Sequence, residues 1–97
     1  MLDKPSQGNR ELARATFRVA LFKRRGLAEL TATDLAARLA DRDADRDDRR
    51  MCLECSHLQT SGGCFAAAQG WLPATSKKHH PVQNLLQRCE RFTWVKP

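Results

Sequence analysis

Four cysteines in the second half of the chain carry its clearest chemistry. They are spaced C-x2-C-x8-C-x24-C, at Cys52, Cys55, Cys64 and Cys89. A Cys-x-x-Cys turn can present two thiolates to one tetrahedral ion, and structural zinc takes four such ligands. Gly62-Gly63 directly precedes the third cysteine and allows a tight turn back toward the first pair. The spacing therefore predicts a structural Zn²⁺ site with four cysteine ligands.

Other uses of these thiols remain open. An iron–sulfur cluster also accepts four thiolates, and thiols without a metal are a further alternative. His57, two residues after Cys55, could replace one cysteine as a ligand. Disulfides need an oxidising compartment, and a thioredoxin-like Cys-x-x-Cys follows a strand, whereas here a charged helix is expected before it.

Energetics favour a metal of some kind. Residues 51–97 contain few large apolar side chains, and a region of roughly 40–50 residues with such a set rarely folds unaided. Structural zinc contributes an apparent 10–16 kcal/mol or so in small peptides, which exceeds any other single contribution available here. Four cysteine ligands leave no open coordination position, and no phosphate-binding loop, nucleophile elbow or His-Glu-x-x-His motif occurs. We therefore expect no enzymatic activity.

The composition indicates the elements that position these residues. Thirteen Ala and twelve Leu stand against three Val, no Ile and no Tyr, which favours helices over strands. We expect a mainly α fold, in which an N-terminal helical hairpin packs on a small four-cysteine, metal-stapled subdomain. That subdomain should have a short β-hairpin or turn and one or two short helices. The expected organisation is a flexible tail (1–8), the hairpin (9–50) and the metal-binding subdomain (51–97).

Local signals set the expected helix boundaries. One helix should run over 9–25, capped by Asn9 and ended by Gly26. A second should run over 32–46, after a capping box formed by Thr31 and Asp34. Its Arg and Asp residues alternate at spacings of three and four, which predicts ion pairs on a solvated surface. Short helices are expected at 64–70 and 81–92.

The formal net charge of +6 suggests an anionic partner. On the first helix, Arg14, Arg18 and Arg25 share one face, and this row could contact phosphates or be an ordinary solvated surface. Lys77, Lys78 and Lys96 are further candidate phosphate contacts, and His79-His80 could join them or lie in an exposed loop. Both tryptophans, Trp71 and Trp94, could stack on unpaired bases or pack in a core.

The tract DDRRMCLECSHLQTSGGC, followed by LLQRCERF, resembles cysteine modules in small zinc-finger-like proteins of bacterial plasmids, phages and integrative elements. The resemblance covers about residues 47–92. It implies that the four cysteines are metal ligands. Together with the positive net charge, such a metal module favours a partner that is DNA or a DNA-handling complex.

Two further functions stay open beside a zinc-containing DNA-binding module. One is a protein-interaction adaptor or inhibitor that uses the hairpin or associates with itself, and the other is an iron–sulfur sensor or electron carrier. No apolar run approaches the roughly 18 residues that span a bilayer, and no signal-like N-terminus is evident. We therefore expect a cytoplasmic protein with no membrane contact and no small-molecule substrate.

Overall fold

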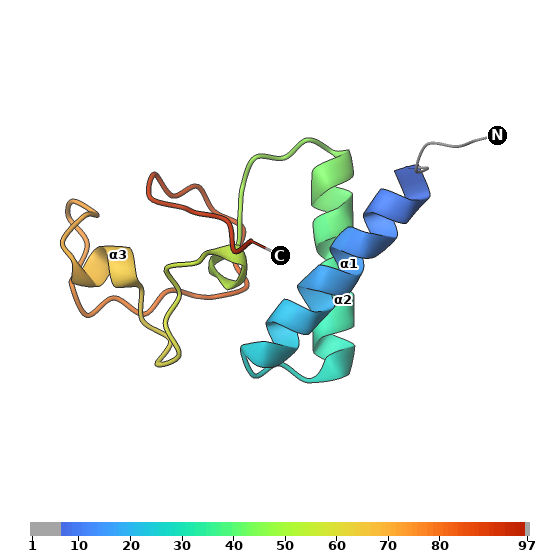
Figure 1. Cartoon of the computed structure of the whole chain (residues 1–97). Helices are drawn as coiled ribbons and strands as arrows, with labels where there is room; N and C mark the ends of the chain where they lie inside the picture. The colour runs from blue at the N-terminus through green and yellow to red at the C-terminus, as the bar shows by residue number, and fades with distance from the viewer. Residues whose placement is uncertain (1–6, 97) are drawn as a thin grey trace. The chain divides into compact units, whose positions relative to one another are not determined.

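Four helical elements follow one another along the chain. The computed structural model describes the backbone of residues 7–96 and the side chains of 10–96. The elements are α1 (Gln7–Arg24), α2 (Glu29–Ala44), the short 3-10 helix η1 (Cys52–Glu54) and α3 (Phe65–Ala68) (Figure 1). Extended pairing over the described residues is limited to three isolated antiparallel bridges. The expectation of a mainly helical fold with two long packed helices and little strand is confirmed.

The chain divides into two compact units, Met1–Asp47 and Asp48–Pro97. The sequence placed a boundary after residue 50, three residues further along. Of the expected tail, residues 1–6 lie outside the described residues, while Gln7 and Gly8 already belong to α1. The first unit holds both long helices, and the second holds all four cysteines.

The first unit is an antiparallel pair of helices packed through a narrow apolar seam. From α1, Leu21 and Phe22 are buried, and from α2, Leu35 and Leu39 are buried. Ala32, one turn before Leu35, and Ala36, between the two leucines, are also buried. Their spacing of three and four residues places them on one face, and their small size lets α1 approach closely (Figure 1).

Both long helices end in the same backbone motif. After α1, the N–H of Gly26 donates to the Lys23 carbonyl (3.0 Å), and the N–H of Leu27 donates to the Phe22 carbonyl (3.0 Å). Gly26 has φ +98°, as this Schellman motif requires. The expected role of Gly26 is thus confirmed. After α2, the equivalent position is occupied by Arg46, with φ 56°, although a left-handed conformation is unfavourable for a residue with a Cβ.

The start of α2 differs from the prediction. The helix begins at Glu29, so Thr31 and Asp34 lie inside it and form no capping box. Ala28 is the N-cap and makes no side-chain hydrogen bond there. Instead, the Glu29 carboxylate lies in the first turn, where the helix dipole favours a negative charge, and pairs with Lys23 of α1 at 3.0 Å.

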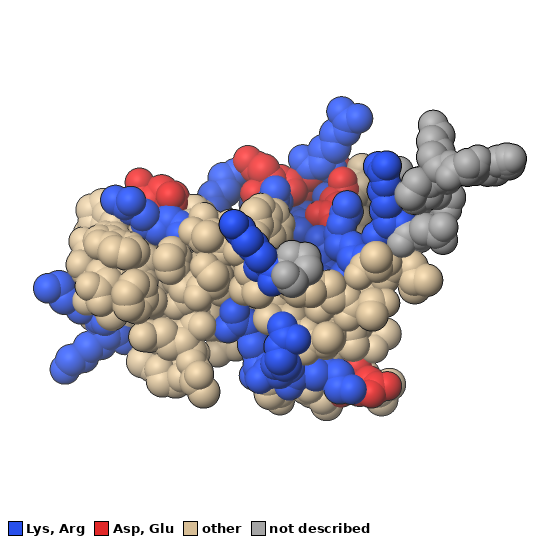
Figure 2. Space-filling view, in the orientation of Figure 1, with Lys and Arg blue, Asp and Glu red and all other residues tan. Residues whose placement is uncertain are grey.

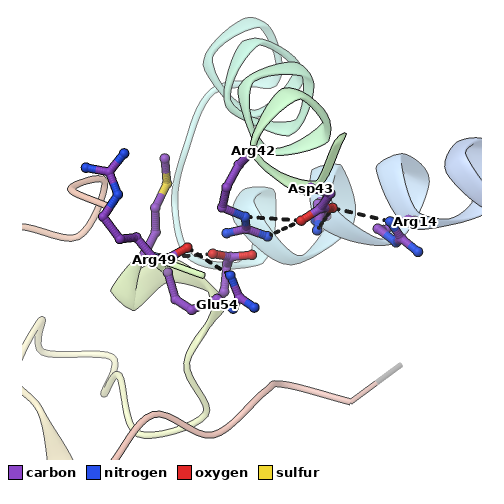
Figure 3. A network of polar contacts seen from close by, with 8 residues as sticks. Arg14, Arg42, Asp43, Arg49 and Glu54 are labelled. Carbon is purple, nitrogen blue, oxygen red and sulfur yellow. Dashed lines mark hydrogen bonds and ion pairs between the residues drawn. The ribbon is translucent and has the colours of Figure 1, made fainter. Parts of the chain in front are cut away.

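Asp43 of α2 is the centre of a cluster of arginines. The Arg18 guanidinium donates to it at 2.7 Å and Arg42 at 2.8 Å, while Arg14 lies at 3.3 Å. Figure 3 shows Arg14 and Arg42 reaching this carboxylate. Burial by itself raises the pKa of Asp43, but the hydrogen bonds and charges of Arg18 and Arg42 outweigh it and lower the pKa below 3.8.

The expected helix over 81–92 is absent, since this segment forms turns and bridges. The N–H of Arg50 donates to the Gln87 carbonyl (2.7 Å), and the N–H of Gln87 donates to the Arg50 carbonyl (2.9 Å). The Gln83 carbonyl accepts from Leu53 (3.1 Å). These backbone groups pair across the second unit and are therefore not available for a helix's own ladder. The other expected short helix is present as α3, within the predicted 64–70.

The two left-handed positions predict opposite effects of substitution. Gly26→Ala should lower the free energy of unfolding by about 1 kcal/mol, since nothing lies within 4 Å of the added Cβ and only backbone strain is introduced. Arg46→Gly should raise it by a similar amount, about 1 kcal/mol, because it removes that strain. Urea denaturation followed by circular dichroism measures both. A destabilised Arg46→Gly variant would contradict this account.

Replacement of Asp43 should make the first unit less stable only where the carboxylate is ionised. Because its pKa in the folded state is lowered, its contribution is complete above pH 3.8 and is lost as the pH falls below that value. Asp43→Asn should cost about 1.5–3 kcal/mol at pH 7, and the difference from the wild type should shrink toward pH 2. Denaturation at both pH values tests this. Asp41→Asn, at an exposed position of the same helix, should have little effect at either.

Candidate metal centre

The four cysteines come from three separate segments of the second unit. Cys52 opens η1 and Cys55 follows its last residue, with the Cys55 N–H donating to the Cys52 carbonyl at 2.9 Å. Cys64 is the N-cap residue of α3. Cys89 lies in a turn that the Phe92 N–H closes by donating to its carbonyl (3.1 Å). A compact Cys-x-x-Cys turn thus faces two more distant thiols.

A tight turn returns the third cysteine to the first pair, as Gly62-Gly63 predicted. Leu58 and Cys64 form an antiparallel bridge, and the Gln59 N–H donates to the Gly63 carbonyl at 2.8 Å. Gly62 has φ +93°, a conformation that few other residues adopt. This loop holds Cys64 beside the segment that carries Cys55.

The last cysteine is held by pairing on both sides of it. Before Cys89, the Arg50–Gln87 bridge fixes the chain. After it, the Ser56 N–H donates to the Thr93 carbonyl at 2.8 Å. Backbone pairing to residues 50–56, which contain the Cys-x-x-Cys turn, therefore holds the chain on both sides of Cys89.

All four cysteines line one cavity of about 30 Å³, together with His57 and Gln87. None of them forms a disulfide. As they stand, the described residues contain no group of three or more His, Cys, Asp or Glu side chains arranged to hold a metal ion. The thiols surround the cavity without closing on a common coordination point.

The thiols differ in burial and in hydrogen bonding. Cys55 is buried, Cys52 and Cys64 are half-buried, and Cys89 is exposed. The Cys55 sulfur accepts the backbone N–H of His57 at 3.4 Å. The Cys52 sulfur accepts from the Gln87 side-chain amide, also at 3.4 Å. Both bonds stabilise a thiolate in place and resemble the outer hydrogen bonds that support metal ligands.

Electrostatics within the cavity disfavour several thiolates at once. Burial, together with the negative charges of Cys55, Cys64 and Cys89, raises the pKa of Cys52 from 9.0 to about 11, against the opposing hydrogen bond from Gln87. A divalent cation in the cavity would reverse the interaction from repulsion to attraction.

The donor set fits a soft or borderline cation. Thiolates select Zn²⁺, Cu⁺ and iron–sulfur clusters over Mg²⁺ or Ca²⁺. Cys52, Cys64 and Cys89 also border a wider, more open hollow of about 420 Å³, which gives an ion a path from solvent.

The predicted arginine row on α1 is not a continuous exposed surface, because its three side chains differ in burial. Arg18 is 7% exposed and bound to Asp43, and Arg14 pairs with the same carboxylate. Arg25 is half-buried at the end of the helix. Arg18 is buried because Asp43, 25 residues later in the chain, gives its guanidinium an acidic partner, whereas the Arg14 side chain is 49% exposed. The other alternative, a fully solvated face, is also wrong for Arg18.

The predicted basic residues of the second unit are exposed. Lys77, Lys78 and Lys96 are on the surface, as are His79 and His80. On the face shown in Figure 2, Lys and Arg side chains occur in several separate groups, and Asp or Glu accompanies some of them.

Neither tryptophan is in the buried core. Trp71 is 42% exposed and Trp94 is 45% exposed. The Arg50 guanidinium lies 4.8 Å from the Trp94 ring centroid, and Phe92 contacts the same ring edge-to-face.

Two contributors to the site gave no signal in the sequence. Gln87, which donates to Cys52, is one of several polar residues in a segment expected to be helical. Arg91, whose Nε donates to the Trp71 carbonyl at 3.3 Å, lies in the same segment. Both roles would be expected only if residues 87–94 were predicted to be extended rather than helical. The residue types in this segment do not favour that prediction.

No family model matches the chain, and neither the curated proteins nor the solved structures contain a similar one. Among the described residues, no helix is long and apolar enough to cross a membrane.

In metal-free protein, the thiols should react with iodoacetamide in a fixed order. Cys89 should be modified first because it is exposed, and Cys55 should be slow because it is buried. Cys52 should also be slow at pH 8, since with a pKa of about 11 almost none of it is thiolate. Mass spectrometry of timed digests measures the order, and rapid modification of Cys55 would contradict the structure.

Proposed function

We propose that this chain is a small, non-enzymatic zinc-binding module that binds nucleic acid. The observation that carries the metal proposal is the convergence of Cys52, Cys55, Cys64 and Cys89 on one small cavity, with no disulfide among them. In this proposal the ion joins three loop segments that otherwise share little apolar contact. Cysteines that form no disulfide suit a reducing compartment such as the cytoplasm.

The thin core of the second unit supports a structural role for the ion. Its large buried apolar side chains are Met51, Leu53 and Leu58, while Phe65, Trp71 and Trp94 are exposed. A unit of this size with so few buried groups commonly needs a metal or disulfides. The four sulfurs fill a tetrahedral coordination shell, so the ion would hold the fold and have no position for substrate.

The charge of the second unit supports the nucleic-acid part of the proposal. Residues 48–97 carry seven Lys or Arg and three Asp or Glu. Zn²⁺ with four thiolates adds a local charge of −2, so the unit remains positive when loaded. Lys77 and Lys78 are exposed in a loop between α3 and the segment of the last cysteine. The resemblance to mobile-element cysteine modules agrees with a partner that is DNA or a DNA-handling complex.

Metal analysis tests the first part. Protein purified without added metal should contain one zinc per chain and be colourless. A chelator should unfold the second unit, because the apparent contribution of a structural zinc is about 10–16 kcal/mol, while the α1–α2 pair should keep its helical circular dichroism signal.

Cys55→Ser should abolish zinc binding, whereas Ser56→Ala at the exposed neighbouring position should retain it. A brown preparation with visible absorbance would show that the site holds an iron–sulfur cluster and not zinc. A metal-free chain that keeps its full fold would reject the metal centre.

Nucleic-acid binding is tested separately with the zinc-loaded chain. A fluorescently labelled oligonucleotide should bind, and the affinity should fall with salt, because phosphate contacts release counterions. Lys77→Ala with Lys78→Ala should weaken binding and reduce the salt slope, whereas Arg38→Ala, at an exposed position of α2, should leave both unchanged. Absence of binding at moderate salt would reject this part of the proposal, and a stable dimer without DNA affinity would favour an adaptor.

A further inference from the structure

Three aromatic rings form a connected cluster on the second unit. His57 stacks with Phe65 at a centroid distance of 6.1 Å. Trp71 meets both rings edge-on, His57 at 5.9 Å and Phe65 at 5.6 Å. These rings, His57, Phe65 and Trp71, are called the aromatic cluster below.

The aromatic cluster is placed on the surface. Phe65 is 39% exposed, while the neighbouring Ala66 and Ala67 in the same helix are fully buried. α3 therefore turns its small residues inward and its large ring outward, which is the reverse of what core packing favours. An exposed group of large rings of this kind marks an interaction surface.

Backbone geometry fixes Trp71 in this position. After α3, the Gly70 N–H donates to the Ala67 carbonyl (2.9 Å) and the Trp71 N–H donates to the Ala66 carbonyl (3.0 Å). This repeats the Schellman motif of α1, with Gly70 at φ +76°. The indole is thus attached to a capped helix end.

Two cationic side chains flank the aromatic cluster. The Lys77 side chain covers Gly70, and its Nζ lies 4.0 Å from the position a Cβ would take there. Arg91 donates from Nε to the Trp71 carbonyl at 3.3 Å. Its remaining guanidinium donors are on an exposed residue. Thr93 adds a hydroxyl that lies 3.4 Å from His57 Nε2.

We propose that the aromatic cluster stacks on an unpaired base of single-stranded nucleic acid while Lys77 and Arg91 contact its phosphates. The exposed rings of Phe65 and Trp71, with Lys77 and Arg91 nearby, offer stacking to a base and charge to a phosphate of a single strand. In a duplex the base faces are already stacked on one another, so the aromatic cluster cannot stack on them. Only the positive charges of this surface would attract a duplex. The inference rests on the proposed nucleic-acid function and names its substrate class.

The first test compares single-stranded with duplex DNA on the zinc-loaded full chain. Fluorescence anisotropy is measured with a labelled oligothymidylate of about 12 nucleotides and with a hairpin duplex. The single strand should bind more tightly. Trp71→Ala should weaken single-strand binding about 5- to 150-fold and leave duplex binding nearly unchanged. Equal loss for both DNAs, or no loss for either, would overturn the inference.

The two tryptophans give a second measurement that needs no disruptive variant. In Trp94→Phe, Trp71 is the single tryptophan, and the oligothymidylate should quench its emission. In Trp71→Phe, Trp94 is the reporter, and quenching should be weak because Trp94 pairs with Phe92 outside the aromatic cluster. The reverse pattern would overturn the assignment to the aromatic cluster.

The cations are tested through the salt dependence of single-strand binding. Lys77→Ala and Arg91→Ala should each reduce the slope of log affinity against log salt by about 0.7, and Arg38→Ala should not.

If the wild type binds neither DNA, the proposed function fails together with this inference. If it binds both DNAs equally and Trp71→Ala has no effect, only the single-strand inference fails. A wild-type dimer that Trp71→Ala makes monomeric would assign the cluster to self-association and also overturn it.

Discussion

The second unit has few buried apolar side chains to hold its segments together. Phe65, Trp71 and Trp94 are exposed, and Met51, Leu53 and Leu58 are its large buried apolar residues. What its segments do share is a set of backbone bridges that bring four thiols around one cavity. Those thiols repel one another when ionised, so the same arrangement that is unfavourable alone becomes favourable around a cation. The proposed functions of this unit depend on a bound cation turning the repulsion among the thiolates into attraction.

The sequence predicted well those features that depend on the local conformational preference of a single residue type. Gly26 ends α1 in the expected conformation, and Gly62-Gly63 turns the chain so that Cys64 returns to the first pair. Both work because glycine alone readily adopts a positive φ. The helical character of the first unit followed from its Ala and Leu content, because helix propensity is a local property.

Features that depend on a distant partner were not predicted. Arg18 resembles any arginine on a charged helix, and its burial follows from Asp43 in another helix. The segment 81–92 has helix-forming residues, but its backbone pairs with residues 50–53 in the folded unit. The cysteine spacing predicted a four-thiol metal site. The four thiols line one cavity, but as they stand the described residues form no group arranged to hold a metal ion. The Gln87 amide that donates to Cys52 lies in the segment that was expected to be helical.

The order of the cysteines along the chain has a consequence for synthesis. During translation, Cys52, Cys55 and Cys64 leave the ribosome well before Cys89, which is separated from the third cysteine by 24 residues. The Arg50–Gln87 bridge and the Ser56–Thr93 hydrogen bond also wait for that late segment. A nascent chain therefore presents an incomplete set of three thiols for a time, during which premature oxidation or capture of a competing metal can divert it from the native arrangement.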